Sequence, residues 1–181
     1  MTNKTFIHNF SLICRKDYSI SFFNRPKIIN IYRSEERQMR NKNVEILNSL
    51  YEDAAAGADA VKTLLPMAES APLKGELIDR LSEYGEITSS IIQTMGYYGK
   101  KPRQTNVVQK VNGWNQTRLW SNDTDDVGIA ETVINGTTLS IAGRSGRLDG
   151  SSGTDPAVRR LCDALTRIDN DGIRRMRGFL S

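Results

Sequence analysis

The stretch that decides the fold is NVEILNSLYEDAAAGADAVKTLLP, residues 43–66. Its apolar and small residues recur at alternating spacings of three and four, which places them on one face of an α-helix. They are Leu47, Leu50, Ala54, Gly57, Val61 and Leu64. Pro66 cannot continue a helix, because it lacks a backbone N–H and its ring clashes with the preceding turn. We therefore predict a helix that ends just before Pro66 and buries this face.

A second helix is predicted after Pro72. The same spacing returns there through Leu77, Leu81, Tyr84, Thr88, Ile91 and Met95. The segment ends in GYYGKKP, residues 96–102, where Gly96 or Gly99 can adopt the left-handed conformation of a helix cap. Because the connection between the two helices is short, we expect them to form an antiparallel hairpin.

Two further long helices and one short helix are predicted in the remaining chain. TNVVQKVNGWNQTRLW, residues 105–120, reads as a short connector helix. The third long helix opens near Asp123 or Thr124 as N-cap, and its predicted stripe is Val127, Ala130, Ile134, Thr137 and Ile141. The last begins at Asp155 with Pro156 in its first turn, and its predicted stripe is Val158, Leu161, Leu165, Ile168, Gly172 and Phe179. GRSGRLDG, residues 143–150, reads as part of a flexible turn.

Residues 1–38 differ in composition from the chain that follows. Ile, Phe, Tyr, Asn and Lys, which share AT-rich codons, make up 19 of these 38 residues, and Ala, Gly and Val are missing. The codons of Glu35, Glu36 and Arg37 can spell a purine-rich run like a bacterial ribosome-binding site, a short spacer before Met39. We therefore expect residues 1–38 to be an unstructured leader from a misassigned start, and residues 39–181 to form one bundle domain. A genuine disordered or strand-forming arm is the alternative.

Without residues 1–38, the charge balance and the histidine and cysteine counts of the chain change. Of the 25 basic and 21 acidic residues, 7 and 3 lie in residues 1–38, which leaves 18 of each. This balance argues against nucleic-acid binding, since no large positive field remains. The only histidine, His8, also lies in the leader, and Cys162 becomes the lone cysteine, which indicates a buried reduced thiol in a cytoplasmic protein. No apolar run approaches a membrane span.

Each long helix carries a glycine near its middle: Gly57, Gly85, Gly136 and Gly172. An interior glycine costs about 0.5 to 1 kcal/mol relative to alanine. Four glycines at the same depth in the four helices predict a waist, which is a level of the bundle where the helix backbones approach closely. The alternative is that the missing side chains make room for a ligand or a metal centre.

The stretches YEDAAAGADAV, DDVGIAETVINGTTLSI and NDGIRRMRGFL resemble the uncharacterised ferritin-like bundle proteins, a bacterial domain of unknown function, particularly its Firmicute members. The resemblance covers residues 43–180. It rests on Tyr51, Asp53, Ala54, Gly57, Gly113, Trp114, Ile129, Ala130, Glu131, Ile134, Gly136, Asn170, Ile173, Phe179 and Leu180. It implies an all-α, ferritin-like antiparallel four-helix bundle with a short connector helix in the crossover. It implies no activity.

Di-iron chemistry is not expected from this fold. Such sites need a Glu from each of two helices and Glu-x-x-His from each of the other two, and the chain after Met39 contains no His. Glu52, Glu83 and Glu86 fall opposite the apolar stripes, whereas Glu131 and Asp169 flank theirs. The missing His also argues against serine and cysteine triads. We therefore assign no catalytic, cofactor-binding or metal-ligating residue and expect no cofactor.

The leading hypothesis is a non-catalytic cytoplasmic bundle that acts through a protein partner or through self-association, so a homo-oligomer is possible. Trp114 and Trp120 are candidate contact residues, although closing the end of the bundle is their more ordinary role. The alternative is a ferritin-like protein that binds metal or a small ligand at the waist. A third possibility is nucleic-acid binding by the arginine-rich C-terminal helix.

Overall fold

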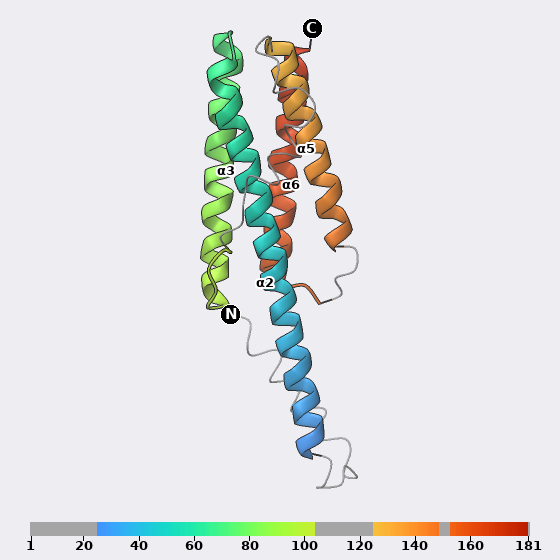
Figure 1. Ribbon diagram of the computed structural model, residues 1–181. Coiled ribbons are helices and arrows are strands. Elements are labelled where there is room, and N and C mark those ends of the chain that lie inside the picture. The colour runs from blue at the N-terminus through green and yellow to red at the C-terminus, as the bar shows by residue number, and fades with distance from the viewer. Residues whose placement is uncertain (1–24, 104–124, 149–152, 181) are drawn as a thin grey trace. The chain divides into compact units, whose positions relative to one another are not determined.

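The computed structural model describes residues 25–103, 125–148 and 153–180, and these residues form helices and short connections without a strand. Figure 1 shows the arrangement. The α-helices are α2 (Arg25–Leu64), α3 (Ala71–Tyr97), α5 (Asp126–Leu148) and α6 (Pro156–Met176), and the 3-10 turns are η1 (Leu65–Met67) and η2 (Arg177–Phe179). The predicted all-α class with four long helices is confirmed.

The contacts within the chain divide it into two units, Met1–Gln38 and Met39–Ser181. The expectation of an unstructured leader does not hold for residues 25–38, which are helical. Residues 1–24 lie outside the described ranges.

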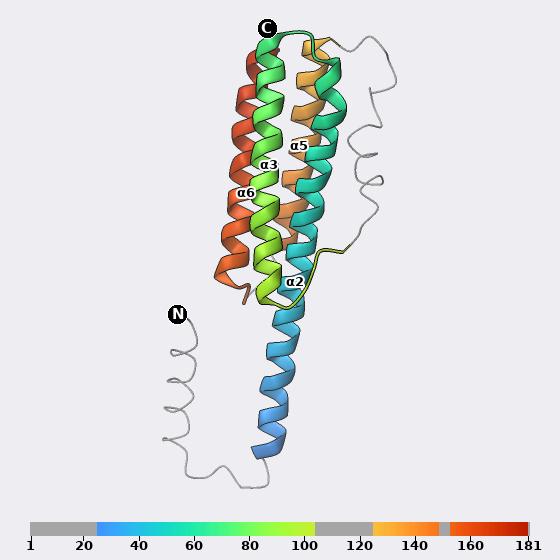
Figure 2. The same cartoon turned by 90° about the vertical axis from the view of Figure 1, so that its left-hand side faces the viewer.

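Hydrogen bonds between the helix ends fix the direction of each helix in the second unit. At one end, the carboxylate of Asp126, which opens α5, accepts hydrogen bonds from the backbone N–H groups of Glu69 and Ser70, just before α3. At the other end, Tyr98, just after α3, donates to Asp155, just before α6. The backbone of Asp155 in turn donates to Asn43 of α2. Therefore α3 and α5 run in one direction, and α2 and α6 run in the other (Figure 2).

The helix boundaries follow from local chemistry. Pro66 lies in η1, directly after α2 ends, as predicted. Ser70 caps α3 by accepting from the N–H of Leu73 at 3.3 Å, and Gly99 takes a positive φ of 65° after the helix. Asp155 caps α6 by accepting from the N–H of Ala157 at 2.8 Å.

The start and the end of α5 differ from the predictions. Asp125 accepts from the N–H of Gly128 at 2.8 Å, so Asp125 provides the cap in place of Asp123 or Thr124, which lie outside the described residues. The helix also continues to Leu148. The expectation of a flexible turn is therefore wrong for residues 143–148.

The core consists of apolar side chains from all four helices. Every residue of the stripe predicted for residues 43–66 is buried. In α5 the buried stripe is rotated from the predicted one, because Val127 is 38% exposed while Ile129 and Val133 are fully buried. Cys162 is buried, as predicted, and forms no disulfide within the described part of the chain.

None of the described helices combines the length and the apolar character that a membrane crossing requires. The predicted connector helix, with Trp114 and Trp120, lies outside the described residues.

Candidate functional site

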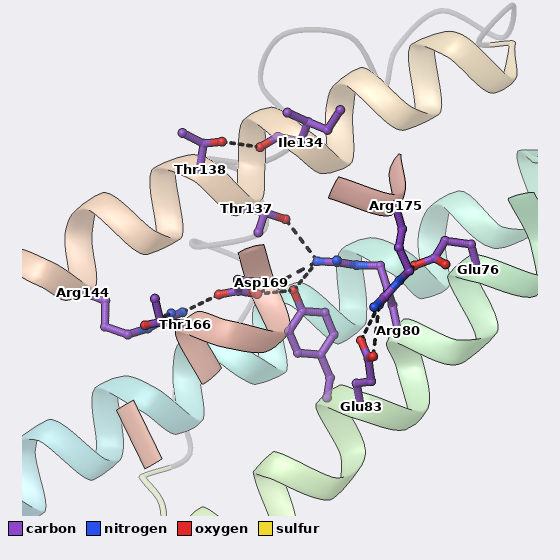
Figure 3. A network of polar contacts seen from close by, with 11 residues as sticks. Glu76, Arg80, Glu83, Ile134, Thr137, Thr138, Arg144, Thr166, Asp169 and Arg175 are labelled. Atoms are coloured by element: carbon purple, nitrogen blue, oxygen red, sulfur yellow. Dashed lines mark hydrogen bonds and ion pairs between the residues drawn. The ribbon is translucent and has the colours of Figure 1, made fainter. Parts of the chain in front are cut away.

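A network of polar side chains occupies the interior, and Figure 3 shows the part of it that α3, α5 and α6 contribute. α2 supplies Asp53, α3 supplies Arg80 and Tyr84, α5 supplies Thr137 and Arg144, and α6 supplies Thr166 and Asp169. Arg80 and Thr137 are completely inaccessible to solvent, and Tyr84, Arg144 and Asp169 are each 2% exposed. Two arginines and two aspartates balance the charge.

Asp169 lies at the centre of the network. Its Oδ1 accepts a hydrogen bond from the Tyr84 hydroxyl at 2.9 Å, and its Oδ2 accepts from Arg144 Nη2 at 2.8 Å. Arg144 also donates to Thr166 at 3.1 Å, and its Nε lies 3.7 Å from Asp53 Oδ2. Because a buried carboxylate is costly unless it is paired and hydrogen-bonded, these contacts are what keep Asp169 in the interior.

Arg80 is only partly satisfied. Its Nη2 donates to the Tyr84 hydroxyl at 2.8 Å and to Thr137 Oγ1 at 3.2 Å, and lies 4.0 Å from Asp169 Oδ1. Its Cζ is 5.3 Å from the centroid of the Tyr84 ring, within cation–π range. In the described part of the chain, Nε and Nη1 of Arg80 and Nε of Arg144 have no hydrogen-bond partner. The network therefore holds buried donors that have no hydrogen-bond acceptor in the described part of the chain.

Burial changes the acidity of the two groups at the centre. Burial, the nearby Asp169 carboxylate and the hydrogen bond to it raise the pKa of Tyr84, while Arg80 opposes the rise. The phenol therefore stays protonated and donates. Burial also raises the pKa of Asp169, against the opposing effects of Arg144, Tyr84 and Arg80. The cost of removing the carboxylate from water exceeds the help from its partners.

Two of the four mid-helix glycines make room for this network. A Cβ at Gly57 would lie 2.7 Å from Cζ of Tyr84. A Cβ at Gly172 would overlap the Arg80 guanidinium, at Nη1 and Cζ. These glycines accommodate the side chains of Tyr84 and Arg80, which is neither the backbone contact nor the ligand space that the sequence suggested.

The predicted four-glycine waist is wrong in one further respect. Gly85 is exposed, and a Cβ added there would have no heavy atom within 4 Å. Gly136 is buried, as a waist would require. The glycines therefore have different roles on different helices.

The polar residues of the predicted stripes are Tyr84, Thr88 and Thr137, and these stripes contain no charged residue. Arg80, Arg144 and Asp169 are buried, although Asp169 was expected only to flank its stripe. Glu83 was expected to be a solvated carboxylate, but it is half-buried and pairs with Arg175 at 2.8 Å. Glu86 is exposed, as predicted, whereas Glu52 and Glu131 are half-buried. Within the described residues, no group of three or more His, Cys, Asp or Glu could hold a metal ion.

The outer face of α3 has an unusual surface for a solvent-exposed helix. It presents an uncharged row at helical spacing, which we call the α3 stripe: Gly75, Ile78, Ser82, Gly85, Ser89, Ile92 and Gly96. All seven residues are exposed, including 55% of Ile78 and 44% of Ile92. Exposed faces normally carry charged residues, and this row carries none.

Comparison with known proteins gives a fold and no activity. The chain matches no family profile, and it matches none of the curated proteins. It is similar to the crystal structure of a DUF305 fragment from Deinococcus radiodurans, with a TM-score of 0.58 and 15% sequence identity, over 77% of this chain and 95% of that chain. At this identity the likeness shows a shared helical fold, that of a domain whose function is unknown.

Proposed function

We propose that this chain is a ferritin-like antiparallel bundle that works without catalysis, by binding a protein partner or a second copy of itself. The connectivity supports the ferritin-like assignment. α3 and α5 follow one another in the order of elements, yet they start at the same end and run in the same direction. This order of helix directions is the one found in ferritin-like bundles, which have one long crossover connection.

The observation that carries the proposal is the α3 stripe. Exposed Ile78 and Ile92 flank Gly85, which leaves a shallow row where another helix could approach closely. The interior favours the same conclusion, since Arg80, Tyr84 and Asp169 are buried and bonded to one another. Burial and this hydrogen bond withdraw the Tyr84 hydroxyl and the Asp169 carboxylate from acid–base chemistry on a substrate in solution. In the described part of the chain Cys162 is a buried thiol, which is compatible with a cytoplasmic location.

Pull-down from native lysate tests the proposal. Ile92→Glu places a charge in the centre of an apolar contact, so we expect the variant to lose proteins that wild type recovers. Leu139→Glu is the matched control, because Leu139 is an apolar residue on α5 with 66% exposure. Equal recovery of every protein by wild type and both variants would contradict a role for the α3 stripe.

A small ligand in the interior is the second candidate, and one observation favours a specific kind. Arg80 Nε and Nη1 have no hydrogen-bond partner in the described part of the chain and are cationic donors, so an anion suits them and a metal cation does not. Thermal unfolding with added phosphate and, separately, with added iron tests this candidate. Stabilisation by phosphate alone would support anion binding, and stabilisation by iron would favour a metal site.

A further inference from the structure

Two charged columns run along the exposed surfaces of α3 and α6. The first, which we call the α3 acidic column, consists of Asp79 and Glu86 and continues to Gln93. The second, the α6 arginine column, consists of Arg160, Arg167 and Arg174. All six side chains are exposed and repeat every seven residues, which is about two helical turns. Each column therefore lies on one side of its helix.

Two hydrogen bonds, one buried and one partly buried, show how the two helices are aligned along their length. The Tyr84 hydroxyl donates to Asp169 at 2.9 Å, and the Tyr98 hydroxyl donates to Asp155 at 2.8 Å. The donors are fourteen positions apart, from within α3 to just after its end, and the acceptors are fourteen positions apart, from just before α6 to within it. Because the helices run in opposite directions with the same rise per residue, a step along one matches an equal step back along the other.

This alignment places the two columns at matching levels. Counted from the Tyr84–Asp169 bond, Asp79 lies at the level of Arg174 and Glu86 lies at the level of Arg167. Gln93 lies at the level of Arg160 by the same count. Every acidic or amide group of one column therefore has an arginine of the other at its own level.

The charges in these columns are largely unused within the described part of the chain. There, the side chains of Asp79, Glu86, Arg160 and Arg167 form no hydrogen bond or ion pair, and Glu86 accepts one from Ser90 only through its backbone carbonyl. Arg174 pairs with Asp171 at 2.9 Å but keeps 76% of its side chain exposed. By contrast, Arg175 on the neighbouring side of α6 pairs with Glu76 and Glu83 of α3. Only the outward-facing charges remain available to a second molecule.

We propose that the exposed surface of α3 and α6 is a homodimer interface, in which α3 of each copy faces α6 of the other. A two-fold axis parallel to the helices leaves every level unchanged and exchanges the two columns. Asp79 then opposes Arg174 of the second copy, and Glu86 opposes Arg167 of the second copy. This inference rests on the proposed function, because it names a second copy as the protein that the α3 stripe contacts.

The small residues of the α3 stripe leave room for the arginine side chains of the second copy. Gly85 and its neighbours Ser82 and Ser89 leave space beside the acidic column. The aliphatic stems of arginines can lie over such a surface while their charged ends reach the carboxylates. A polyanion such as nucleic acid fits less well, since Asp79 and Glu86 would repel it at the levels where Arg174 and Arg167 attract it.

Sedimentation velocity of the full chain over a range of protein and salt concentrations tests the interface. We expect wild type to dimerise and the dimer to weaken with salt, because salt screens exposed charges. Glu86→Arg and Arg167→Glu should each weaken dimerisation by about tenfold or more, since a two-fold axis makes every reversal count twice. The double variant Glu86→Arg/Arg167→Glu restores opposite charges and should regain most of the affinity. Glu45→Arg, at an exposed position of α2, is the control and should dimerise like wild type.

Three outcomes of the sedimentation experiment would overturn the inference. They are a wild type that stays monomeric at all concentrations, single variants that dimerise as wild type does, and a double variant that does not recover. Asp79→Arg/Arg174→Asp repeats the exchange at the next level, should the first pair fold poorly by circular dichroism. Salt-sensitive binding of a labelled DNA duplex by a monomeric wild type, lost in Arg167→Glu, would assign the arginine column to nucleic acid and also overturn it. If the dimer fails while Ile92→Glu still loses a protein from lysate, the proposed function stands without this inference.

Discussion

Gly172 lacks a side chain at the position where the Arg80 guanidinium lies. A fully buried arginine needs space as well as partners, and the absence of a Cβ on α6 provides that space. Gly57 serves Tyr84 in the same way from α2. At the scale of single residues, two glycines and two large polar side chains therefore depend on each other, and a change in either member of a pair disturbs the other.

Gly172→Ala should destabilise the protein by about 3 kcal/mol, because Arg80 must move and its hydrogen bonds to Tyr84 and Thr137 weaken. Gly85→Ala is the matched control in an exposed helical position with open space around it. It should stabilise the protein by roughly 0.5 to 1 kcal/mol through helix propensity. Urea unfolding of the two variants measures the difference. Similar free energies of unfolding for both would refute the dependence of Arg80 on Gly172.

At the scale of helices, one carboxylate joins the starts of α3 and α5. Asp126 Oδ1 and Oδ2 accept from the N–H groups of Glu69 and Ser70 at 2.8 and 3.1 Å. Hydrogen bonds from Ser70 and Glu69 hold the pKa of Asp126 below the ordinary value of 3.8. The carboxylate satisfies two amides ahead of α3 and holds the start of α5 next to them.

Asp126→Ala should lower the free energy of unfolding by about 1 kcal/mol at neutral pH, as the loss of a helix cap does. A lowered pKa in the folded state stabilises the protein above the ordinary pKa, and that contribution is lost as the pH falls through the lowered value. The difference between wild type and variant should therefore shrink on acidification below the ordinary value. Thermal unfolding over a pH series measures this trend. A constant difference would show that ionisation of Asp126 is irrelevant.

The apolar spacing was sufficient to predict four long helices and most of their ends, because Pro66, Pro156 and Gly99 act through local backbone chemistry. It did not predict the start of α2, since residues 25–38 have no apolar periodicity that requires burial. The rotated stripe of α5 was missed because Thr, Gly and Ala are common on both faces of that helix.

The buried network was missed because charged residues were read as surface residues. Arg80 lies in the buried row of α3 between Leu77 and Tyr84, and Asp169 lies in the buried row of α6 between Leu165 and Gly172. Oppositely charged residues within the apolar rows of different helices were the available signal. Their pairing depends on how the helices are aligned, which spacing within one helix does not contain.

At the scale of the whole molecule, the second unit has a core that begins after Met39. Residues 33–42 are exposed, and the first buried side chain along the described part of α2 is Asn43, followed by Ile46. A chain shortened to begin at Met39 should therefore unfold within about 2 °C of the full chain, since it retains every buried contact of the unit. Scanning calorimetry of the two proteins measures this. A clear fall in melting temperature would show that residues 1–38 stabilise the bundle.

The Arg80 guanidinium beside Gly172 also gives the bundle a mechanical property. A pull along the helix axes would load α3 and α6 in shear, because they lie side by side and run in opposite directions. Purely apolar helix surfaces resist such sliding only weakly. Here the Arg80 guanidinium lies in the space left by Gly172, and Tyr84 is hydrogen-bonded across to Asp169, so both contacts oppose the sliding. Sliding by one turn, about 5.4 Å, requires both to release together. The bundle should therefore transmit tension from one end to the other with little sliding of α3 against α6.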